Sequence, residues 1–362
     1  MSGNVNSMSG VLIVGAGFTG AIIAAELKRV AGDAGKLLSV TLWDKARGSG
    51  GRFTTARCPT NAKCHADVGG QYVSTTENDI NKFGRFYTGL RERGLLTDMT
   101  AAVEGASPYT GEGVRDMVAP LGMSSLVKHF LATSTASFVS EREVRSIQKT
   151  PEGKLNVATI SGVTEEFDAV VLTMPVPQIL KLQGDFYDQK AFEELTNRNV
   201  EYSTRFTLVL FFPDRCDIGL KFGFKFVDND DVIRYVAVDN IKRGAPRDPA
   251  ALVVHTTWQF GKDHLEESKE QVEQILLDRV YQMFPELPKT DSRKIHKWRF
   301  SQVRSKEAAC EGSKTPYFVL NKKPLVLCAG DGFTDSSLNG CLESSTSACR
   351  FMESEWKLSP SP

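Results

Sequence analysis

The most constraining feature of the chain is VLIVGAGFTG at residues 11–20, an apolar run that breaks into three glycines. The run predicts a buried strand at 11–14. Apolar residues at helical spacing then predict a helix over 18–30, which the following AGDAG ends. A second strand is expected at 37–44, so the segment has the form of a strand–helix–strand unit.

The three glycines suit a dinucleotide-binding turn. A diphosphate needs backbone amides close to its oxygens and a helix N-terminus pointing at its charge, and both require residues without a β-carbon. Gly15 suits the tight turn, Gly17 the approach of the phosphates, and Gly20 the close packing of helix on strand. Asp44 ends the next strand, where a carboxylate can hold ribose hydroxyls. The pattern predicts a nucleotide site.

Two further motifs favour a flavin over a loosely bound nicotinamide coenzyme. In GSGGR at 48–52, Gly51 and Arg52 would bring a second set of amides and a guanidinium to the same diphosphate. Asp331 follows a strand in CAGDGF, where it could accept from ribityl hydroxyls, and Gly340 is expected at the start of the final helix, facing the reduced ring. Taken alone, these last two motifs fit an ordinary loop and cap equally well.

Charge and hydropathy exclude several classes of protein. Basic and acidic residues number 44 each, so no net field gathers nucleic acid, and the basic run IKRGAPR at 241–247 is expected to be a solvated loop. No stretch approaches the roughly 20 apolar residues that span a bilayer, and the polar opening lacks the pattern of a signal peptide. Seven cysteines without a disulfide-like framework indicate the cytoplasm, with unconventional secretion left open. Cys58, Cys64 and His65 lack a second ligand pair at zinc spacing, so no metal is expected.

The length of 362 residues suits two domains. Several β-rich runs between 200 and 260, followed by an amphipathic helix at about 264–284, indicate that a second domain is inserted into the nucleotide-binding one. The expected division is a discontinuous FAD-binding domain at 10–75, 116–184 and 321–356, a β-rich substrate domain at 76–115 and 185–320, and a flexible tail at 1–9.

The motifs WDKARGSGGRFTT, ADVGGQYV, LTMPVPQIL, HTT, KWRFSQV and CAGDGFTDSSLNGC resemble the renalase family, over about residues 11–350. The resemblance implies an α/β fold, namely an FAD-binding Rossmann-like domain of p-hydroxybenzoate-hydroxylase type with an inserted β-rich substrate domain. It also implies non-covalent FAD and oxidation of the 2- and 6-dihydro isomers of NAD and NADP. The products would be NAD(P)+ and, from O2, hydrogen peroxide. No nucleic-acid or membrane partner is implied, and a monomer is expected.

The expected site follows from the motifs and the resemblance together. A dihydropyridine that gives up hydride becomes an aromatic pyridinium, so no general base is required and catalysis rests on positioning. We expect the substrate to meet Asn240, His255, Trp298 and Arg299, although His255 fits a satisfied core histidine equally well and Trp298 also fits packing. The expected cofactor contacts are Gly15, Ala16, Gly17, Thr19, Gly20, Asp44, Lys45, Gly51, Arg52, Asp331 and Gly340, with Gln71 and Tyr72 near the isoalloxazine.

Three other functions remain open. A flavin amine oxidase would need aromatic side chains flanking the ring, and KWRFSQV offers only one of them. An FAD-containing secreted protein could act through its surface as a signal or binding partner. An NAD-dependent dehydrogenase would carry no yellow prosthetic group.

Overall fold

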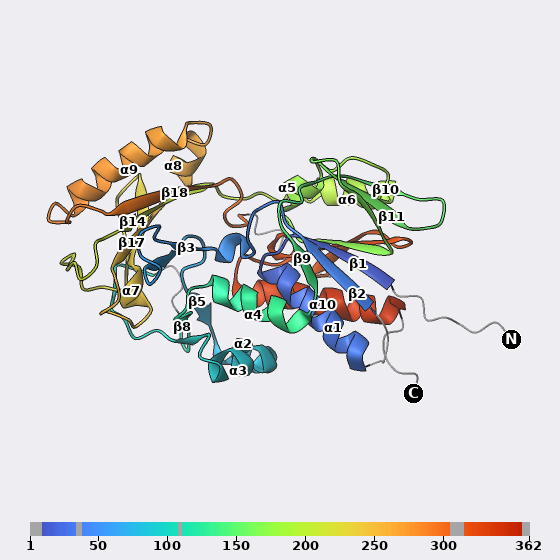
Figure 1. The fold of residues 1–362 in the computed structure, drawn as a ribbon, viewed down its shortest axis with the longest axis horizontal. Coiled ribbons are helices and arrows are strands. Elements are labelled where there is room, and N and C mark those ends of the chain that lie inside the picture. Colours follow the sequence, from blue (N-terminus) through green and yellow to red (C-terminus); the bar gives the residue numbers. More distant parts are fainter. Residues whose placement is uncertain (1–8, 34–37, 108–110, 305–314, 357–362) are drawn as a thin grey trace. The chain divides into compact units, whose positions relative to one another are not determined.

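The computed structural model describes residues 9–33, 38–107, 111–304 and 315–356, and Figure 1 shows their helices and strands. Most of the predicted tail at 1–9 lies outside these residues. The chain divides into two compact units, each built from separate stretches. The first unit comprises 1–51, 127–201 and 303–362, and the second comprises 52–126 and 202–302.

These boundaries differ from the expected ones, most of all at residues 52–75, which belong to the second unit. The physical reason is packing. Ala56, Cys58, Cys64 and Ala66 of a short hairpin are buried in a core with strands of the second unit. At the other boundary, residues 303–320 fall in the first unit, whose sheet takes up Tyr317–Asn321 as a strand.

The first unit holds a six-stranded sheet, a three-stranded sheet and several helices. The strands are β1 (Ser9–Val14), β2 (Leu38–Trp43), β9 (Ser137–Val139), β10 (Val144–Lys149), β11 (Leu155–Thr159), β12 (Thr164–Phe167), β13 (Ala169–Leu172), β19 (Tyr317–Asn321) and β20 (Leu325–Ala329). The helices are α1 (Phe18–Asp33), α5 (Val176–Ile179), α6 (Gln189–Asn197), the 3-10 turn η3 (Asp331–Phe333) and α10 (Leu338–Trp356), and α4 (Ser124–Ser134) runs in from the second unit.

The large sheet of the first unit has the strand order β19-β20-β13-β1-β2-β9. All neighbouring pairs are parallel except β19 with β20. Helices α1 and α10 lie side by side against it (Figure 1), and their apolar side chains share one buried core with β1, β2, β13 and β20. The chain leaves β1 toward one edge and returns through β13 toward the other, and ligands of such sheets bind at the carboxyl ends of the strands where the order reverses.

The second unit is dominated by a sheet of order β18-β14-β17-β16-β15-β7. Its strands are β7 (Val103–Glu104), β14 (Arg205–Phe211), β15 (Phe224–Phe226), β16 (Ile233–Val238), β17 (Ala251–Thr256) and β18 (Ser292–Trp298). The smaller sheets comprise β3 (Thr55–Arg57) with β4 (His65–Asp67), and β5 (Val73–Thr75) with β8 (Arg115–Val118) and β6 (Thr97–Asp98). The helical elements are η1 (Gly51–Phe53), which begins at the boundary, α2 (Glu77–Lys82), α3 (Gly84–Glu92), α7 (Asp239–Lys242), α8 (Trp258–Asp263) and α9 (Lys269–Met283).

The local predictions agree well with the structure. The strand, helix and strand expected at 11–14, 18–30 and 37–44 are β1, α1 and β2, and the closing helix is α10. The helix expected at 264–284 is α9, which begins after a capping box formed by Ser268 and covers one face of the large second-unit sheet. These segments carry strong periodicity and clear end signals.

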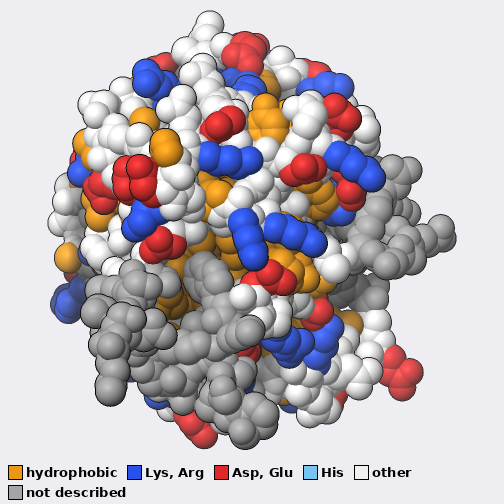
Figure 2. Space-filling view, turned by 90° about the vertical axis from the view of Figure 1, so that its right-hand side faces the viewer, with side chains coloured by type: hydrophobic (Ala, Val, Ile, Leu, Met, Phe, Trp, Pro, Cys, Tyr) orange, Lys and Arg blue, Asp and Glu red, His pale blue; other side chains and the backbone are white. Residues whose placement is uncertain are grey.

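The surface agrees with a balanced charge. On the face drawn in Figure 2, basic and acidic side chains are interspersed, and no broad patch of one sign covers the coloured residues. Within the part of the chain that the structure describes, no helix is long and apolar enough to cross a membrane.

Candidate cofactor and substrate site

The turn after β1 has the backbone geometry that a diphosphate requires. Gly15 has a φ of +111°, and a β-carbon there would lie 2.5 Å from the Thr173 hydroxyl. A β-carbon on Gly20 would lie 2.1 Å from the Gly15 carbonyl oxygen, so only glycine lets α1 begin this close to β1. The Thr173 hydroxyl is within hydrogen-bond distance of the Val14 and Gly15 carbonyls, at 2.9 and 3.0 Å. The ends of β1 and β13 are thereby joined where the strand order reverses.

The second glycine-rich stretch lies directly against this turn. Gly50 donates its N–H to the Ala16 carbonyl at 2.9 Å, and Gly17 and Gly50 form an isolated parallel bridge. Gly51 has a φ of +53°, and a β-carbon on it would lie 3.1 Å from the Gly17 Cα. The two stretches meet backbone to backbone, with no side chain between them. Two loops that bind one diphosphate require this close approach.

Asp44 follows β2 and is bound to the same turn. Its Oδ2 accepts the Ala16 N–H at 2.8 Å, and its Oδ1 accepts the Ala46 N–H at 2.8 Å. Burial raises the pKa of Asp44, against the effect of these two N–H groups and of Lys45, whose own side chain is exposed. Each carboxylate oxygen keeps a second lone pair, so Asp44 can still accept from ribose hydroxyls.

The loop after β20 lies at the same end of this sheet. A β-carbon on Gly330 would be 3.6 Å from the Thr173 carbonyl oxygen and 3.8 Å from the Thr19 hydroxyl. Asp331 is 3% exposed, and its Oδ2 accepts the Ser336 hydroxyl at 2.6 Å. The structure therefore brings the loop that carries Asp331 beside Thr19 and Thr173, although this loop and Thr19 come from opposite ends of the chain.

Gly340 lies in the first turn of α10, as its third residue. Its N–H donates to the Ser337 hydroxyl at 2.9 Å, which is an N-terminal cap. A β-carbon at this position would lie 2.4 Å from the Asp335 carbonyl oxygen. The close approach to Asp335 accounts for this glycine, and its contact with a cofactor stays a prediction.

Two contacts of Arg52 lie within the second unit. Its Nη1 donates to the Ser301 carbonyl at 3.3 Å, and its guanidinium lies 5.9 Å from the centre of the Tyr202 ring. The Arg52 carbonyl accepts the Gly70 N–H at 2.8 Å, which ties this residue to the segment that carries Gln71. The predicted contact of Arg52 with a diphosphate stays a prediction.

Gln71 connects the predicted cofactor and substrate residues of the second unit. Its Nε2 lies 2.5 Å from the Asp67 carbonyl oxygen, 3.1 Å from that of Gly69 and 3.4 Å from His255 Nε2. Its Oε1 accepts a hydrogen bond from Lys242 Nζ at 3.1 Å. The buried Gln71 side chain therefore has a partner at each end of its amide.

His255 is a neutral, partly buried histidine on β17. Burial, Arg205 and Lys242 lower its pKa to about 3, while a hydrogen bond with the Val68 backbone acts in the opposite direction. Its ring centre lies 5.5 Å from that of Tyr235. At neutral pH the imidazole is therefore uncharged and a very weak base.

Trp298 and Tyr72 present aromatic surface beside the same segment. The Trp298 Nε1 donates to the Thr207 hydroxyl at 2.9 Å, and a β-carbon on Gly69 would lie 3.2 Å from the indole. Tyr72 stacks on Phe224 at 4.8 Å. Both side chains pack against one buried cluster, so the structure brings together Gln71, Tyr72, His255 and Trp298.

Arg299 and Asn240 have other surroundings. Arg299 forms an exposed ion pair with Glu266 at 2.9 Å. The Asn240 side-chain amide donates to the Asp248 carbonyl at 3.2 Å, and its Oδ1 is buried without a partner among the described residues. A direct role of either residue with substrate stays a prediction.

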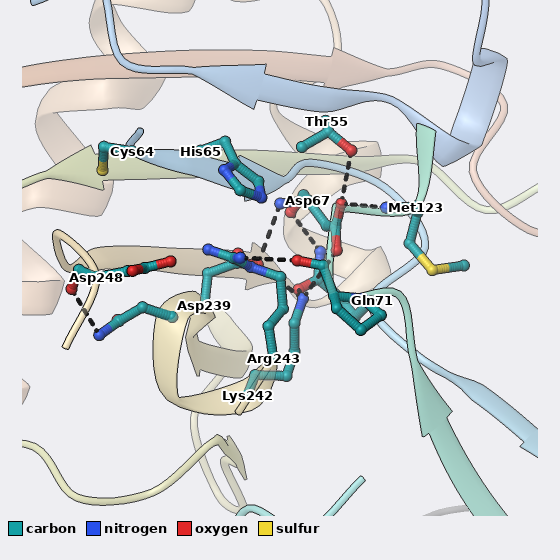
Figure 3. Close-up of polar contacts among 12 residues, drawn as sticks. Thr55, Cys64, His65, Asp67, Gln71, Met123, Asp239, Lys242, Arg243 and Asp248 are labelled. Atoms are coloured by element: carbon teal, nitrogen blue, oxygen red, sulfur yellow. Dashed lines mark hydrogen bonds and ion pairs between the residues drawn. The ribbon is translucent and has the colours of Figure 1, made fainter. Parts of the chain in front are cut away.

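A buried ion-pair cluster, absent from the sequence expectations, lies beside Gln71 (Figure 3). Lys242 Nζ is 2.7 Å from Asp239 Oδ1 and 3.2 Å from Asp67 Oδ2, and Arg243 Nε is 2.6 Å from Asp239 Oδ2. None of the four side chains is more than 2% exposed. The expectation that 241–247 forms a solvated loop is therefore wrong for Lys242 and Arg243, because two carboxylates balance their charges in the interior.

The aspartates of the cluster also accept hydrogen bonds from groups around it. Asp67 Oδ1 accepts from the Met123 N–H and the Thr55 hydroxyl, each at 2.7 Å. Burial would raise the pKa of Asp239, but Lys242 and Arg243 outweigh it and lower that pKa to about 2. An aspartate inside the buried run HADV was the one signal in the sequence that a charge is buried here.

Tyr235 is a further residue that the sequence expectations missed. It is 5% exposed, and its hydroxyl has no partner among the described residues. Burial raises its pKa well above the ordinary value, so the group is a neutral phenol. An unpaired buried hydroxyl beside His255 is costly unless a ligand meets it.

Comparisons with known proteins agree with these features. The profile of the flavin containing amine oxidoreductases matches residues 82–352, and that of the NAD(P)-binding Rossmann-like domain matches residues 13–89. Renalase of Mus musculus is 36% identical over 351 residues, which cover 96% of this chain and 99% of the mouse protein. This chain belongs to the renalase family. The resemblance seen in its motifs is confirmed, and it is a flavin-dependent oxidoreductase.

A solved structure supports the fold of this renalase-family chain. A candidate protoporphyrinogen oxidase of Exiguobacterium sp. 255-15 superposes with a TM-score of 0.70 at 14% identity, covering 96% of this chain and 99% of that protein. The mixed α/β fold with a Rossmann-like domain is thus confirmed. The glycine turn, Asp44 and Asp331 fit the diphosphate and sugar end of a flavin dinucleotide. Among the described residues, no group of three His, Cys, Asp or Glu is placed to hold a metal ion.

Proposed function

We propose that this renalase-family protein is an FAD-dependent oxidase of isomeric dihydronicotinamides, the 2- and 6-dihydro forms of NAD and NADP. The observation that carries the proposal is the protonation state of the residues around Gln71. His255, with a pKa of about 3, is too weak a base to remove a proton at neutral pH, and Asp67 and Asp239 are engaged in buried ion pairs. Oxidation of a dihydropyridine needs no base, because loss of hydride makes the ring aromatic.

FAD bound at this site would supply a hydride acceptor at N5, and its two electrons would go with two protons to O2 as hydrogen peroxide. The glycine turns and Asp44 bind its diphosphate and ribose, with Ala16, Thr19, Lys45, Arg52, Asp331 and Gly340 as further proposed contacts. Tyr72 and Trp298 offer aromatic faces that can orient a flat ring. An uncharged His255 places no positive charge beside a substrate that becomes a cation.

Oxidation of an amine is the second candidate, and the profile of the flavin containing amine oxidoreductases favours it. Aromatic residues near His255, namely Tyr72, Tyr235 and Trp298, are the kind of side chain that such a site uses. The two candidates differ in what reduces the flavin.

The deciding experiment mixes the purified flavoprotein, without oxygen, with 6-dihydroNAD, 2-dihydroNAD, ordinary 4-dihydroNADH or a catecholamine, and follows flavin absorbance. We expect rapid bleaching by a 2- or 6-dihydro isomer, with NAD+ formed in equal amount and hydrogen peroxide released when air is admitted. Bleaching by the amine alone would replace the proposal with amine oxidation. A flavoprotein that no donor reduces would favour a signalling or binding role.

The proposal extends to several finer points. It includes non-covalent FAD, a fold of the p-hydroxybenzoate-hydroxylase type, a monomer and a cytoplasmic location. It assigns FAD binding to the first unit and substrate binding to the second. Denaturation with acid followed by filtration tests the cofactor linkage, because non-covalent FAD passes the filter and covalent flavin stays with the protein.

A further inference from the structure

The Gln71 side-chain amide can take only one orientation. Its Oε1 faces the Lys242 ammonium at 3.1 Å, and its Nε2 faces the carbonyl oxygens of Asp67 and Gly69 at 2.5 and 3.1 Å. A flipped amide would set its N–H groups against the ammonium and its oxygen against two carbonyl oxygens. Three hydrogen bonds would become three repulsive contacts.

This orientation determines which His255 nitrogen carries the proton. Gln71 Nε2 can only donate. Its two N–H groups face three neighbours, the Asp67 and Gly69 carbonyl oxygens and, at 3.4 Å, His255 Nε2, so one N–H is shared. His255 Nε2 must therefore present its lone pair, and in a neutral imidazole the proton is then on Nδ1. The imidazole also has a hydrogen bond with the Val68 backbone.

Lys242 is fixed as firmly as the amide it binds. Its three ammonium protons match three acceptors, namely Asp239 Oδ1, Asp67 Oδ2 and Gln71 Oε1, and the side chain is fully buried. The two cations, Lys242 and Arg243, balance two carboxylates. The cluster therefore orients the Gln71 amide without adding net charge. Figure 3 shows Asp67, Gln71 and the α7 side chains converging in this way.

We propose that Lys242 is a positioning residue, which orients the Gln71 amide and, through it, holds His255 as the neutral Nδ1–H tautomer. The importance of this tautomer for catalysis rests on the proposed function, in which His255 faces the substrate. Arg205 and Lys242 are the charged groups that act on the imidazole, and the Tyr235 ring packs beside it. The arrangement keeps a cation from forming next to the substrate ring.

The test reads the imidazole itself and needs no substrate. The chain has five histidines, so the 15N-labelled holoprotein gives few ring signals, and His255→Gln identifies the one that matters. Two- and three-bond 15N–1H couplings distinguish the two neutral tautomers and the imidazolium. We expect His255 to be the Nδ1–H form alone from pH 6 to pH 9.

Two variants remove the orienting contact in different ways. Lys242→Met with Asp67→Asn removes the ammonium and one carboxylate together, and Gln71→Met leaves all four charges in place. In both we expect at least a tenfold fall in the ratio of Nδ1–H to Nε2–H, because free imidazole prefers the Nε2–H form. Lys221→Met, which changes a lysine that is 78% exposed, should leave the ratio unchanged.

An Nε2–H ring or an imidazolium in the unaltered protein would overturn the inference. An unchanged tautomer in a folded Gln71→Met protein would overturn it too. This variant leaves all four charges in place, so its result does not depend on whether the ion cluster tolerates substitution. Failure of the substrate test with 6-dihydroNAD would overturn the proposed function but not this result, so the two failures are distinguishable.

Discussion

Gly17 and Gly51 lie so close that a β-carbon on Gly51 would come within 3.1 Å of the Gly17 Cα. The two residues come from separate loops, one after β1 and one after β2. A side chain at Gly51 would therefore press on the turn that holds Gly17. This shared geometry is the basis of the first prediction.

Gly51→Ala should weaken FAD binding by at least about tenfold. An alanine at a φ of +53° costs roughly 1–2 kcal/mol, and its methyl group pushes against Gly17. Fluorescence titration of the apoprotein with FAD measures the effect. Gly48→Ala is the matched control, because a β-carbon there meets no atom within 4 Å. Equal affinity of the two variants would show that the second glycine stretch does not face the diphosphate.

The free energy of unfolding should fall in acid because of His255. Its pKa falls from an ordinary 6.5 to about 3 on folding, so the unfolded chain takes up the proton first. The contribution is complete above about pH 6.5 and is lost as the pH falls toward 3. We expect the urea midpoint of His255→Gln to fall less than that of the unaltered protein between pH 6.5 and pH 4. Parallel curves would contradict the burial of a neutral ring.

Tyr235→Phe should separate stability from substrate binding. Removing a buried hydroxyl that lacks a partner should stabilise the ligand-free protein by about 1 kcal/mol. If the hydroxyl meets the substrate, KM for 6-dihydroNAD rises about fivefold, the equivalent of one hydrogen bond. Thermal unfolding and steady-state rates measure the two effects. A loss of stability with unchanged KM would point to a structural partner for the hydroxyl.

Trp298→Phe and Arg299→Ala should differ sharply, although the residues are adjacent. Trp298→Phe breaks the hydrogen bond with Thr207 and reduces the aromatic wall, so KM should rise several-fold. Arg299→Ala removes an exposed ion pair with Glu266, worth less than about 1 kcal/mol, and KM should stay within about twofold. A larger effect of Arg299→Ala would support its predicted role at the substrate.

The features that sequence predicted well are local ones. The turn at Gly15 and Gly20, the strand before it and the helix after it lie within one short stretch, where steric rules act between near neighbours. The motifs also carried the family assignment, which the 36% identity to the mouse renalase confirms.

The buried cluster could not be predicted because its members are far apart in the chain. Lys242 meets an aspartate at position 67, and a run containing KR is normally expected at the surface. Pairing across such a distance depends on the folded sheet and on α7, which is a single turn without strong periodicity. The compact units differ from the expected domain boundaries for a related reason, since the hairpin β3–β4 packs with strands that come much later in sequence.

The order in which the strands are made has a consequence for synthesis. In the first unit, β13 lies between β1 and β20, and β20 is Leu325–Ala329. In a growing polypeptide the glycine turn is made long before β20, so the sheet on which that turn rests lacks one of its parallel strands while the intervening segments are synthesised. Chains that stop before β20 should therefore carry the nucleotide motif on a sheet in which the outer edge of β13 is unpaired.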